Sequence, residues 1–320
     1  MIVALAILVV VGLGLCFELL AILCASAPRS ASSIRIGAQE PAGDADAVIP
    51  RVIWTYWDTL PPPEFVGRCI ALWRRFAADH EIRIVDRASA SRWLSDDIDR
   101  LAFEKLPAYR QADWLRLQLL IRHGGIWMDG STLLTQGLDW VHLLRAEARA
   151  DVVGFYIDRY TTDIDHPIVE NWFIAAAPGN GFLKAWAREL DLALKDGEVA
   201  YLEKLRSEGR LEALAQGIPE EMRPYLAMHV ACSVVLARPA IDGRLVLQRA
   251  EDVAFAFHAA LRWRKRHLFA RLALTPAPRR PPALIKLRSG DRAVIERNLA
   301  RGWLWRRSLM GRLLEAASAA

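Results

Sequence analysis

Cysteine is scarce in this chain, and the common catalytic signatures are missing from it. The 320 residues include 4 cysteines, none in a CxxC or other paired spacing, so neither a zinc site nor a disulfide framework is indicated. Free thiols of this kind suit a reducing compartment. HExxH, GxSxG, phosphate-loop and GxGxxG motifs are also absent, which removes the usual support for a protease, serine hydrolase, nucleoside triphosphatase or dehydrogenase.

Charge is nearly missing from the start of the chain. Residues 2–27 are almost all Ala, Ile, Leu, Val and Gly, with Glu18 as the only charged residue, and such a run is long enough to cross a bilayer as a helix. A cleaved signal peptide is the alternative, because residues 24–27 are small. The first cations, Arg29 and Arg35, follow the run. We therefore predict an uncleaved transmembrane anchor over residues 1–27, with the body of the protein in the cytoplasm.

The middle of the chain has the composition of a globular domain, since 53% of all residues are hydrophobic and 25% are charged. Residues 28–48 are small, polar and turn-forming, which predicts a flexible linker. Beyond the linker, helix and strand patterns alternate, and this alternation predicts an α/β domain with a mainly parallel sheet over residues 49–260. The predicted strands cover residues 52–56, 81–85, 126–128, 152–156 and 172–176, and the predicted helices cover residues 107–122, 182–194, 199–206 and 225–236.

Residues 261–320 are strongly basic and rich in tryptophan. They carry 15 Lys and Arg against 3 acids, with Trp263, Trp303 and Trp305 interleaved. Basic residues mixed with tryptophan at helical spacing suit an anionic membrane surface, and a solvated cationic face is the alternative. Nucleic acid is disfavoured as a partner because no recognised binding motif accompanies the charge. With an apolar N-terminal segment also present, we predict a helical region associated with a membrane surface.

The most informative segment is residues 112–131. Asp113 and Arg116 lie three apart on an apolar segment of helical period, and Gly124 and Gly125 then form a turn that gives backbone freedom and close approach. A short strand follows, and Asp129 stands at its end, where open α/β sheets bind ligands. The alternatives are an intrahelical salt bridge for the first pair and a turn-capping role for Asp129. A largely apolar helix favours a ligand role, because buried ions need partners.

These residues carry a resemblance. The pattern ADxxRxxxLxxxGGxWxD, together with residues 49–57, 69–73 and 171–176 in this order, resembles capsular polysaccharide synthesis proteins, which are relatives of glycosyltransferase family 32 and of glucosylating toxin domains. The similarity spans about residues 49–290. It implies a GT-A-like fold and transfer of a sugar, with retention, from a nucleotide-sugar donor, UDP-linked in this family, to a lipid-linked acceptor or a growing surface polysaccharide.

The resemblance also implies roles for particular residues. Asp129 would bind Mn²⁺ or Mg²⁺, although Ser131 stands where the wider superfamily has a second aspartate, which weakens the metal assignment. Asp113 and Arg116 would contact the donor sugar and diphosphate, and Asp129 completes this predicted catalytic set. Donor-binding residues would include Trp54, which would stack on the base ahead of Trp57, and two residues near the diphosphate, Ser131 and Lys286.

Other polar residues carry weaker signals. Asn171 either binds sugar hydroxyls or caps a strand, and His229 and His258 are by default packing residues. Because of Ser131, the competing function is a non-catalytic, membrane-bound partner in polysaccharide assembly that keeps the fold. Of the two functions, we predict the enzyme. Its predicted partners are a nucleotide sugar, a lipid-linked or polysaccharide acceptor and a membrane, but not nucleic acid.

Overall fold

The computed structural model describes residues 2–37, 48–94 and 100–319. Within these ranges a seven-stranded sheet forms the centre of the molecule, in the order β1-β8-β6-β7-β4-β2-β3. Its strands are β1 (Ser33–Gly37), β2 (Val52–Tyr56), β3 (Glu81–Val85), β4 (Gly125–Met128), β6 (Val152–Tyr156), β7 (Val169–Ala176) and β8 (Arg244–Arg249). The strands predicted from the sequence are all present in this sheet.

The sheet is mixed, but most of its strands point the same way. The pairs β2–β3, β2–β4 and β6–β8 are parallel, whereas β7 is antiparallel to both of its neighbours and β1 is antiparallel to β8. Five of the seven strands in the described sheet therefore run in one direction. The predicted α/β class with a mainly parallel sheet is confirmed, and reversal of β7 brings its first residues to the edge at which β2, β4 and β6 end.

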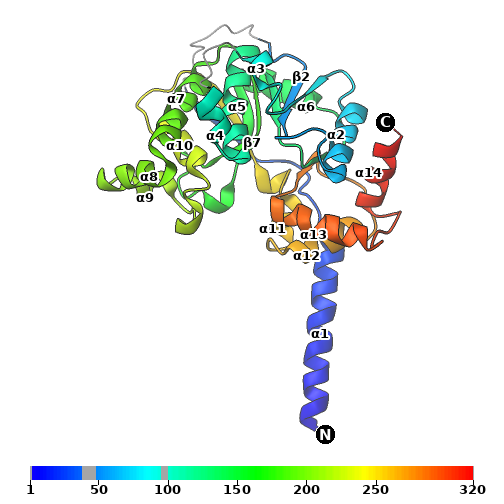
Figure 1. Cartoon of the computed structure of the whole chain (residues 1–320). Helices are drawn as coiled ribbons and strands as arrows, with labels where there is room; N and C mark the ends of the chain where they lie inside the picture. The colour runs from blue at the N-terminus through cyan, green and yellow to red at the C-terminus, as the bar shows by residue number, and fades with distance from the viewer. Residues whose placement is uncertain (1, 38–47, 95–99, 320) are drawn as a thin grey trace.

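Helices cover both faces of the sheet (Figure 1). On one face, Trp54 and Trp127 of the sheet share a core with α5, α7 and α10, and on the other face Ile53 and Phe155 share a core with α2 and α6. Two short helices, α3 and α4, follow β3, and the helices α8, α9 and α10 follow α7. The bounds are α2 (Glu64–Phe76), α3 (Ala90–Trp93), α4 (Arg100–Lys105), α5 (Ala108–His123), α6 (Asp139–Ala148), α7 (Gly181–Asp196), α8 (Glu198–Ser207), α9 (Leu211–Ala215) and α10 (Ala227–Leu236).

The predicted linker contains a strand. β1 lies inside residues 28–48 and pairs with β8 along its whole length, from Ser33 opposite Gln248 to Gly37 opposite Arg244. The alternation of Ile34 and Ile36 with exposed residues lets this short segment cover the edge of the sheet. Part of the linker is therefore an edge strand, and residues 38–47 of the predicted linker lie outside the described residues.

The basic C-terminal part packs onto the domain. It follows α11 (Ala256–Ala260) and contains α12 (Lys265–Ala273), β9 (Leu284–Lys286), α13 (Ser289–Ala300) and α14 (Leu309–Ser318), which Figure 1 shows in orange to red. Leu268 of α12 and Leu313 of α14 share a core with Phe65 and Leu72 of α2. β9 forms a two-stranded sheet with β5 (Thr132–Leu134), directly after the Asp-Gly-Ser segment. The C-terminal part therefore contributes to the domain that carries the predicted site.

The first helix, α1 (Ile2–Cys24), extends away from the body of the molecule (Figure 1). Its described apolar side chains are exposed, among them Leu13, Leu15 and Phe17. Within the described ranges, we find no helix with both the length and the apolar character that crossing a membrane requires. The prediction of a transmembrane anchor over residues 1–27 therefore gains no support from the described residues.

Candidate functional site

A cavity of about 550 Å³ opens at the edge of the sheet where β2, β4 and β6 end and β7 begins. Its walls come from these strand ends, from the first turns of α5, from the segment before α10, and from the start of α12 and α13. A volume of this size is typical of small-molecule sites. The position is the edge at which open α/β sheets bind ligands, as the sequence predicted.

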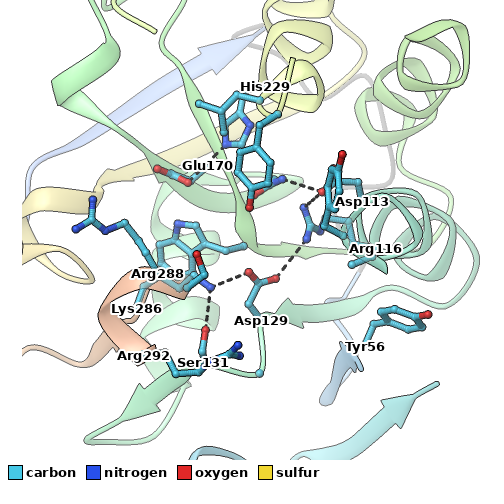
Figure 2. Close-up of a pocket in the computed structure, with 18 of the residues that line it drawn as sticks. Tyr56, Asp113, Arg116, Asp129, Ser131, Glu170, His229, Lys286, Arg288 and Arg292 are labelled. Carbon is cyan, nitrogen blue, oxygen red and sulfur yellow. Dashed lines mark hydrogen bonds and ion pairs between the residues drawn. The ribbon is translucent and has the colours of Figure 1, made fainter. Parts of the chain in front are cut away.

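Asp129 lies at the centre of this cavity, between two cationic side chains (Figure 2). Its Oδ2 accepts a hydrogen bond of 2.7 Å from the Lys286 ammonium. Its Oδ1 accepts hydrogen bonds of 3.0 Å from the indole of Trp127 and 3.3 Å from the guanidinium of Arg116. The Asp129 side chain remains 28% exposed, so the carboxylate is held in place while part of it faces the cavity.

These partners keep Asp129 ionised. Burial by itself raises the pKa of the Asp129 carboxyl, but the charges of Lys286 and Arg116, with hydrogen bonds from Lys286 and Trp127, outweigh burial and bring the pKa below its usual value. At neutral pH the cavity therefore holds a fixed negative charge flanked by two positive ones.

Asp113 and Arg116 meet one another and Asp129. The Arg116 guanidinium donates to Asp113 Oδ1 at 2.7 Å and reaches Asp129 from the other side, and Asn171 Nδ2 donates to the same Asp113 oxygen at 3.1 Å. Asp113 and Arg116 are nearly buried, at 8% and 4% side-chain exposure. The predicted helix pair is therefore part of the site, and the Asp113 carboxylate orients Arg116 and Asn171 toward the cavity.

Arg110 belongs to the same network and was not predicted from the sequence. It donates to Asp113 Oδ2 at 2.8 Å and to Glu198 Oε1 of α8 at 2.6 Å, and its side chain is 1% exposed. The signal in the sequence was its position three residues before Asp113, the same spacing that brings in Arg116. Arg110 thus anchors the start of α5 and fixes the orientation of Asp113.

The two positions that follow α5 require glycine because other residues approach their backbone closely. Gly124 and Gly125 have φ values of +63° and +100°, a region that other residues rarely adopt. A Cβ on Gly124 would lie 2.7 Å from the Pro178 ring, and one on Gly125 would lie 2.6 Å from the Val52 carbonyl oxygen. The predicted role of these glycines in the turn is confirmed. The turn sets the register of β4 and so delivers Asp129 to the cavity.

Ser131 and Lys286 are brought together by the pairing of β5 with β9. Lys286 lies opposite Thr132 in this pairing, and the Leu287 amide donates to the Ser131 carbonyl at 3.1 Å. The Ser131 hydroxyl donates to the Leu287 carbonyl at 2.8 Å and accepts from Lys286 Nζ at 3.3 Å. Residues 155 positions apart in the chain are thereby neighbours in the cavity.

Trp54 is not part of the cavity wall. It is fully buried, at 0% exposure, and its indole donates to the Gly124 carbonyl at 2.9 Å. Its ring packs against Trp93 and His123 in the core. Trp54 shares a face of β2 with Tyr56 but lies two residues before the end of the strand, so it does not reach the cavity. The stacking role predicted for Trp54 therefore does not fit the structure, whereas the rings that line the cavity include Trp57.

Other aromatic rings face the cavity. Tyr56 lies at the end of β2, hydrogen-bonds to Gln111 through its hydroxyl, and has a pKa raised to about 12, chiefly by burial. Tyr109 and Tyr225 line the mouth of the cavity with ring centroids 5.4 Å apart, and both are exposed, at 44% and 58%. No period or motif in the sequence singled out these two tyrosines, which come from different elements.

The residues around Asp129 do not suit the predicted Mn²⁺ or Mg²⁺. Such cations bind through several oxygen ligands, but both Asp129 oxygens accept hydrogen bonds from cationic or N–H donors, and the Ser131 hydroxyl is already bonded to Leu287 and Lys286. Among the described residues there is no group of three or more His, Cys, Asp or Glu side chains that could hold a metal ion. The Lys286 ammonium contacts both ends of the Asp-Gly-Ser segment.

Further cations line the mouth of the cavity. Lys265 lies at the start of α12, and Arg288 and Arg292 flank the start of α13. The Arg292 guanidinium lies over the Trp57 ring at 5.0 Å and the Arg288 guanidinium over the Trp263 ring at 4.9 Å. From the sequence these three cations were assigned, with most of the basic segment, to a membrane surface. The structure instead places these three cations at the cavity.

Of the polar residues that carried weaker signals in the sequence, two line the cavity and one lies in the core. His229 lines the cavity, with its Nε2 3.6 Å from Oε2 of Glu170, and both residues are nearly buried. Asn171 also lines it. His258 is a core residue, with its Nε2 3.0 Å from Oδ2 of Asp291, and burial lowers its pKa despite that neighbouring carboxylate.

The fold and the cavity together define an α/β protein with a charged small-molecule site at the carboxyl edge of its sheet. The model of the capsular polysaccharide synthesis protein family matches residues 31–191, half of the 320-residue chain. The chain therefore belongs to the capsular polysaccharide synthesis protein family, which confirms the resemblance seen in the sequence.

Individual relatives carry the name glycosyltransferase. The chain is 32% identical over 166 residues to the O-glycosyltransferase braB of Annulohypoxylon truncatum, a match that covers 45% of this chain and 38% of that protein. It is 27% identical over 175 residues to the glycosyltransferase afumC of Aspergillus fumigatus, covering 49% of this chain and 43% of that protein. The matches thus span less than half the length of these relatives.

Among solved structures, the chain is similar to the PaToxG glycosyltransferase, at 15% sequence identity and a TM-score of 0.34, over 82% of this chain and 87% of that one.

Proposed function

We propose that this protein is a glycosyltransferase with a GT-A-like fold. It transfers a sugar from a nucleotide-sugar donor, UDP-linked, to a lipid-linked acceptor or a growing surface polysaccharide, with retention of configuration. The proposal is supported by membership in the capsular polysaccharide synthesis protein family and by two relatives named glycosyltransferases. The single observation that carries it is the ionised Asp129, held between Arg116 and Lys286 in a cavity of nucleotide-sugar size.

Two regions of the cavity match the sugar and the diphosphate of a nucleotide-sugar donor. The sugar lies near Asp129 and Asn171, whose oxygen and amide groups face the cavity and match sugar hydroxyls. The diphosphate lies toward Lys286, whose ammonium contacts Asp129, and toward Arg288 and Arg292 at the mouth of the cavity. Guanidinium and ammonium groups are the usual partners of phosphate oxygens in proteins.

The nucleotide base then lies against an aromatic surface at the mouth. Tyr109 and Tyr225 present exposed rings there, and Trp57 lies under the Arg292 guanidinium. Aromatic rings recognise a base by offset stacking, which tolerates small differences in placement. These rings replace Trp54 in the role that the sequence suggested.

Catalysis in this proposal rests on orientation and on charge. As the bond between the sugar and the diphosphate breaks, negative charge builds up on the leaving diphosphate, and Lys286, Arg288 and Arg292 stabilise it. Arg116, which donates to both Asp113 and Asp129, holds the sugar in the reactive position together with Asp129. His229 and Glu170 line the same cavity and offer a base for the acceptor hydroxyl.

Attachment to a membrane, with the body on the cytoplasmic side, is part of the proposal. Glu18 of α1 forms ion pairs of 2.5 Å with Arg264 and 2.9 Å with His267, next to Lys265 at the cavity. α1 thus leaves the body beside α12 (Figure 1), and Lys265 at the start of α12 lines the cavity. A lipid-linked acceptor on the same membrane would reach the donor from that side.

The competing function is a non-catalytic assembly partner, favoured by the hydrogen bonds that already hold both Asp129 oxygens and by Ser131 in the place of an acid. Hydrolysis or transfer of UDP-sugars by the purified full-length chain separates the two functions. We expect slow release of UDP from at least one UDP-sugar, faster when lipid-linked acceptors in detergent are added. Asp129→Asn is expected to lower this release by about 100-fold while the chain remains folded by circular dichroism.

A chain that is folded, yet binds no UDP and releases none from a panel of UDP-hexoses and UDP-N-acetylhexosamines, would refute the transferase proposal. Binding of UDP without any turnover across this panel and these acceptors would favour the non-catalytic function. Full activity in Asp129→Asn would reject the site assignment while leaving the class of reaction standing.

A further inference from the structure

One lysine in the cavity occupies the position at which a metal ion was expected. Lys286 Nζ lies 2.7 Å from Asp129 Oδ2 and 3.3 Å from Ser131 Oγ, so the ammonium joins the two side chains of the Asp-Gly-Ser segment (Figure 2). We propose that this ammonium takes the place of a divalent cation, so that the protein binds the diphosphate of its donor without a metal ion. The inference rests on the proposed function.

The hydrogen-bonding capacity of the ammonium matches this role. An ammonium has three N–H donors, and the contacts with Asp129 and Ser131 use two of them. The third can donate to a diphosphate oxygen, because Lys286 lines the cavity and its side chain is 10% exposed. A divalent cation in such a site would join a carboxylate to the diphosphate. The Lys286 ammonium makes the same connection with a single positive charge.

The protein side chains are already committed to this arrangement. The single proton of the Ser131 hydroxyl is donated to the Leu287 carbonyl at 2.8 Å, and its oxygen accepts from Lys286. Asp129 Oδ1 accepts from Arg116 and Trp127. A divalent cation would have to break several of these bonds to collect the oxygen ligands that it requires.

Charge opposes a metal ion at the same place. A divalent cation bound to Asp129 would lie close to the Lys286 ammonium and the Arg116 guanidinium, both within hydrogen-bonding distance of that carboxylate. Like charges at such separations repel strongly in a partly buried site. The ammonium avoids this conflict because it is the charge that Asp129 already balances.

The backbone prevents Lys286 from leaving the site easily. β9 pairs with β5 so that Lys286 lies opposite Thr132, and the Lys286 amide donates to the Ala254 carbonyl at 3.1 Å. The side chain therefore starts from a fixed point beside the end of β4. Its ammonium is a built part of the cavity and not a surface charge that swings in and out.

The test is a calorimetric titration of the full-length chain with UDP, once with excess EDTA and once with Mn²⁺. We expect the same dissociation constant in both titrations. Lys286→Met keeps an unbranched apolar stem but removes the ammonium, and we expect it to bind UDP about 10-fold more weakly or worse in EDTA, because a charge-assisted hydrogen bond is lost. Lys204→Met, at an exposed position of α8, is the matched control and is expected to bind as the wild type does.

Each other outcome has a defined meaning. If the wild type binds UDP only with Mn²⁺, or more than about 10-fold more tightly with it, the inference is overturned while the transferase proposal stands. If Lys286→Met, with an unchanged melting temperature, binds UDP in EDTA like the wild type, the inference is also overturned. If the wild type binds no UDP in either condition, the nucleotide-donor part of the proposed function fails, and the inference fails with it.

Discussion

Two aspartates in this protein are each held by a pair of basic side chains, yet they differ in what a ligand can reach. Asp129 lies between Arg116 and Lys286 and is 28% exposed. Asp291 lies between Arg288 and His258 and is 0% exposed. One carboxylate faces the cavity, and the other lies inside the protein at the start of α13.

The difference follows from what surrounds each carboxylate. Asp291 accepts from the Arg288 amide at 3.1 Å and from the Arg288 guanidinium at 2.8 and 3.0 Å, which caps α13. In the Asp129 cluster, Lys286 keeps an N–H donor that can turn toward the cavity. The Asp291 carboxylate therefore serves structure, because it is fully covered, whereas part of the Asp129 carboxylate and the Lys286 ammonium face the cavity.

The largest effect is expected from removal of the covered carboxylate. Asp291→Ala leaves the buried His258 and the Arg288 guanidinium without their shared partner and removes the cap of α13. We expect the free energy of unfolding to fall by about 3–5 kcal/mol, as when one member of a buried ion pair is removed. Urea denaturation followed by circular dichroism measures this loss. A loss no greater than that of Asp129→Asn would end the distinction between the two clusters.

The exposed carboxylate is expected to affect turnover more than stability. Asp129→Asn keeps the shape of the side chain but releases Lys286 and Arg116 from their charged partner. We expect turnover of a UDP-sugar to fall by about 100-fold, because a small misplacement of the sugar is costly, with a change of about 1 kcal/mol or less in unfolding. Steady-state kinetics and urea denaturation on the same preparation test both parts.

Acid should remove stabilisation from both the Asp129 and the Asp291 cluster. The positive charges around them lower the pKa of both carboxyls in spite of burial, which alone would raise it. A lowered pKa in the folded state stabilises the fold above the unfolded value of about 4, and this stabilisation is lost as pH falls through the lower, folded value. We therefore expect unfolding stability to decrease below about pH 4, with a shallower decrease in Asp291→Asn. An equally steep decrease in that variant would contradict the role given to Asp291.

The smallest effect is expected at the rim of the cavity. Arg292 is partly exposed and only loosely paired, since its guanidinium lies 3.8 Å from Glu296. We expect Arg292→Gln to weaken UDP binding by about 3-fold at low salt and to have little effect at about 0.5 M NaCl, because exposed charges are screened. Titrations at both salt concentrations measure this. A loss that is independent of salt would mean that Arg292 contacts the diphosphate directly.

Much of the sheet and part of the site could be predicted from local patterns. Alternation and apolar runs predicted the strands that end at Tyr56, precede Asp129 and follow Asn171, and the role of the Gly124–Gly125 turn in close approach was predicted correctly. Asp113 and Arg116 were predictable because three residues on a helix place two side chains on one face. These features depend on neighbours in the sequence, so the sequence contains them.

Local sequence patterns did not predict the contacts between segments that are distant in the chain. Trp54 was predicted to stack on the base because the related toxin domains have a stacking aromatic on the first strand, but the packing of Trp93 and His123 buries it. Arg288 and Arg292 looked like surface charge until α13 was seen to begin at the cavity. β9 was missed because a strand of three residues is recognisable only beside its partner, and β1 was missed because it lies among small, polar residues that predicted a linker.

The sequence by itself determined the class of fold, the family and the place of Asp129 at the end of a buried strand, because period, glycine turns and motif order are local properties. Only the tertiary structure decided which charges surround that aspartate. The pairing of β5 with β9 sets Lys286 beside Ser131 across 155 positions of chain, and no local rule specifies such a pairing. The identity of the cation at the site therefore depends on packing, and the structure assigns it to Lys286.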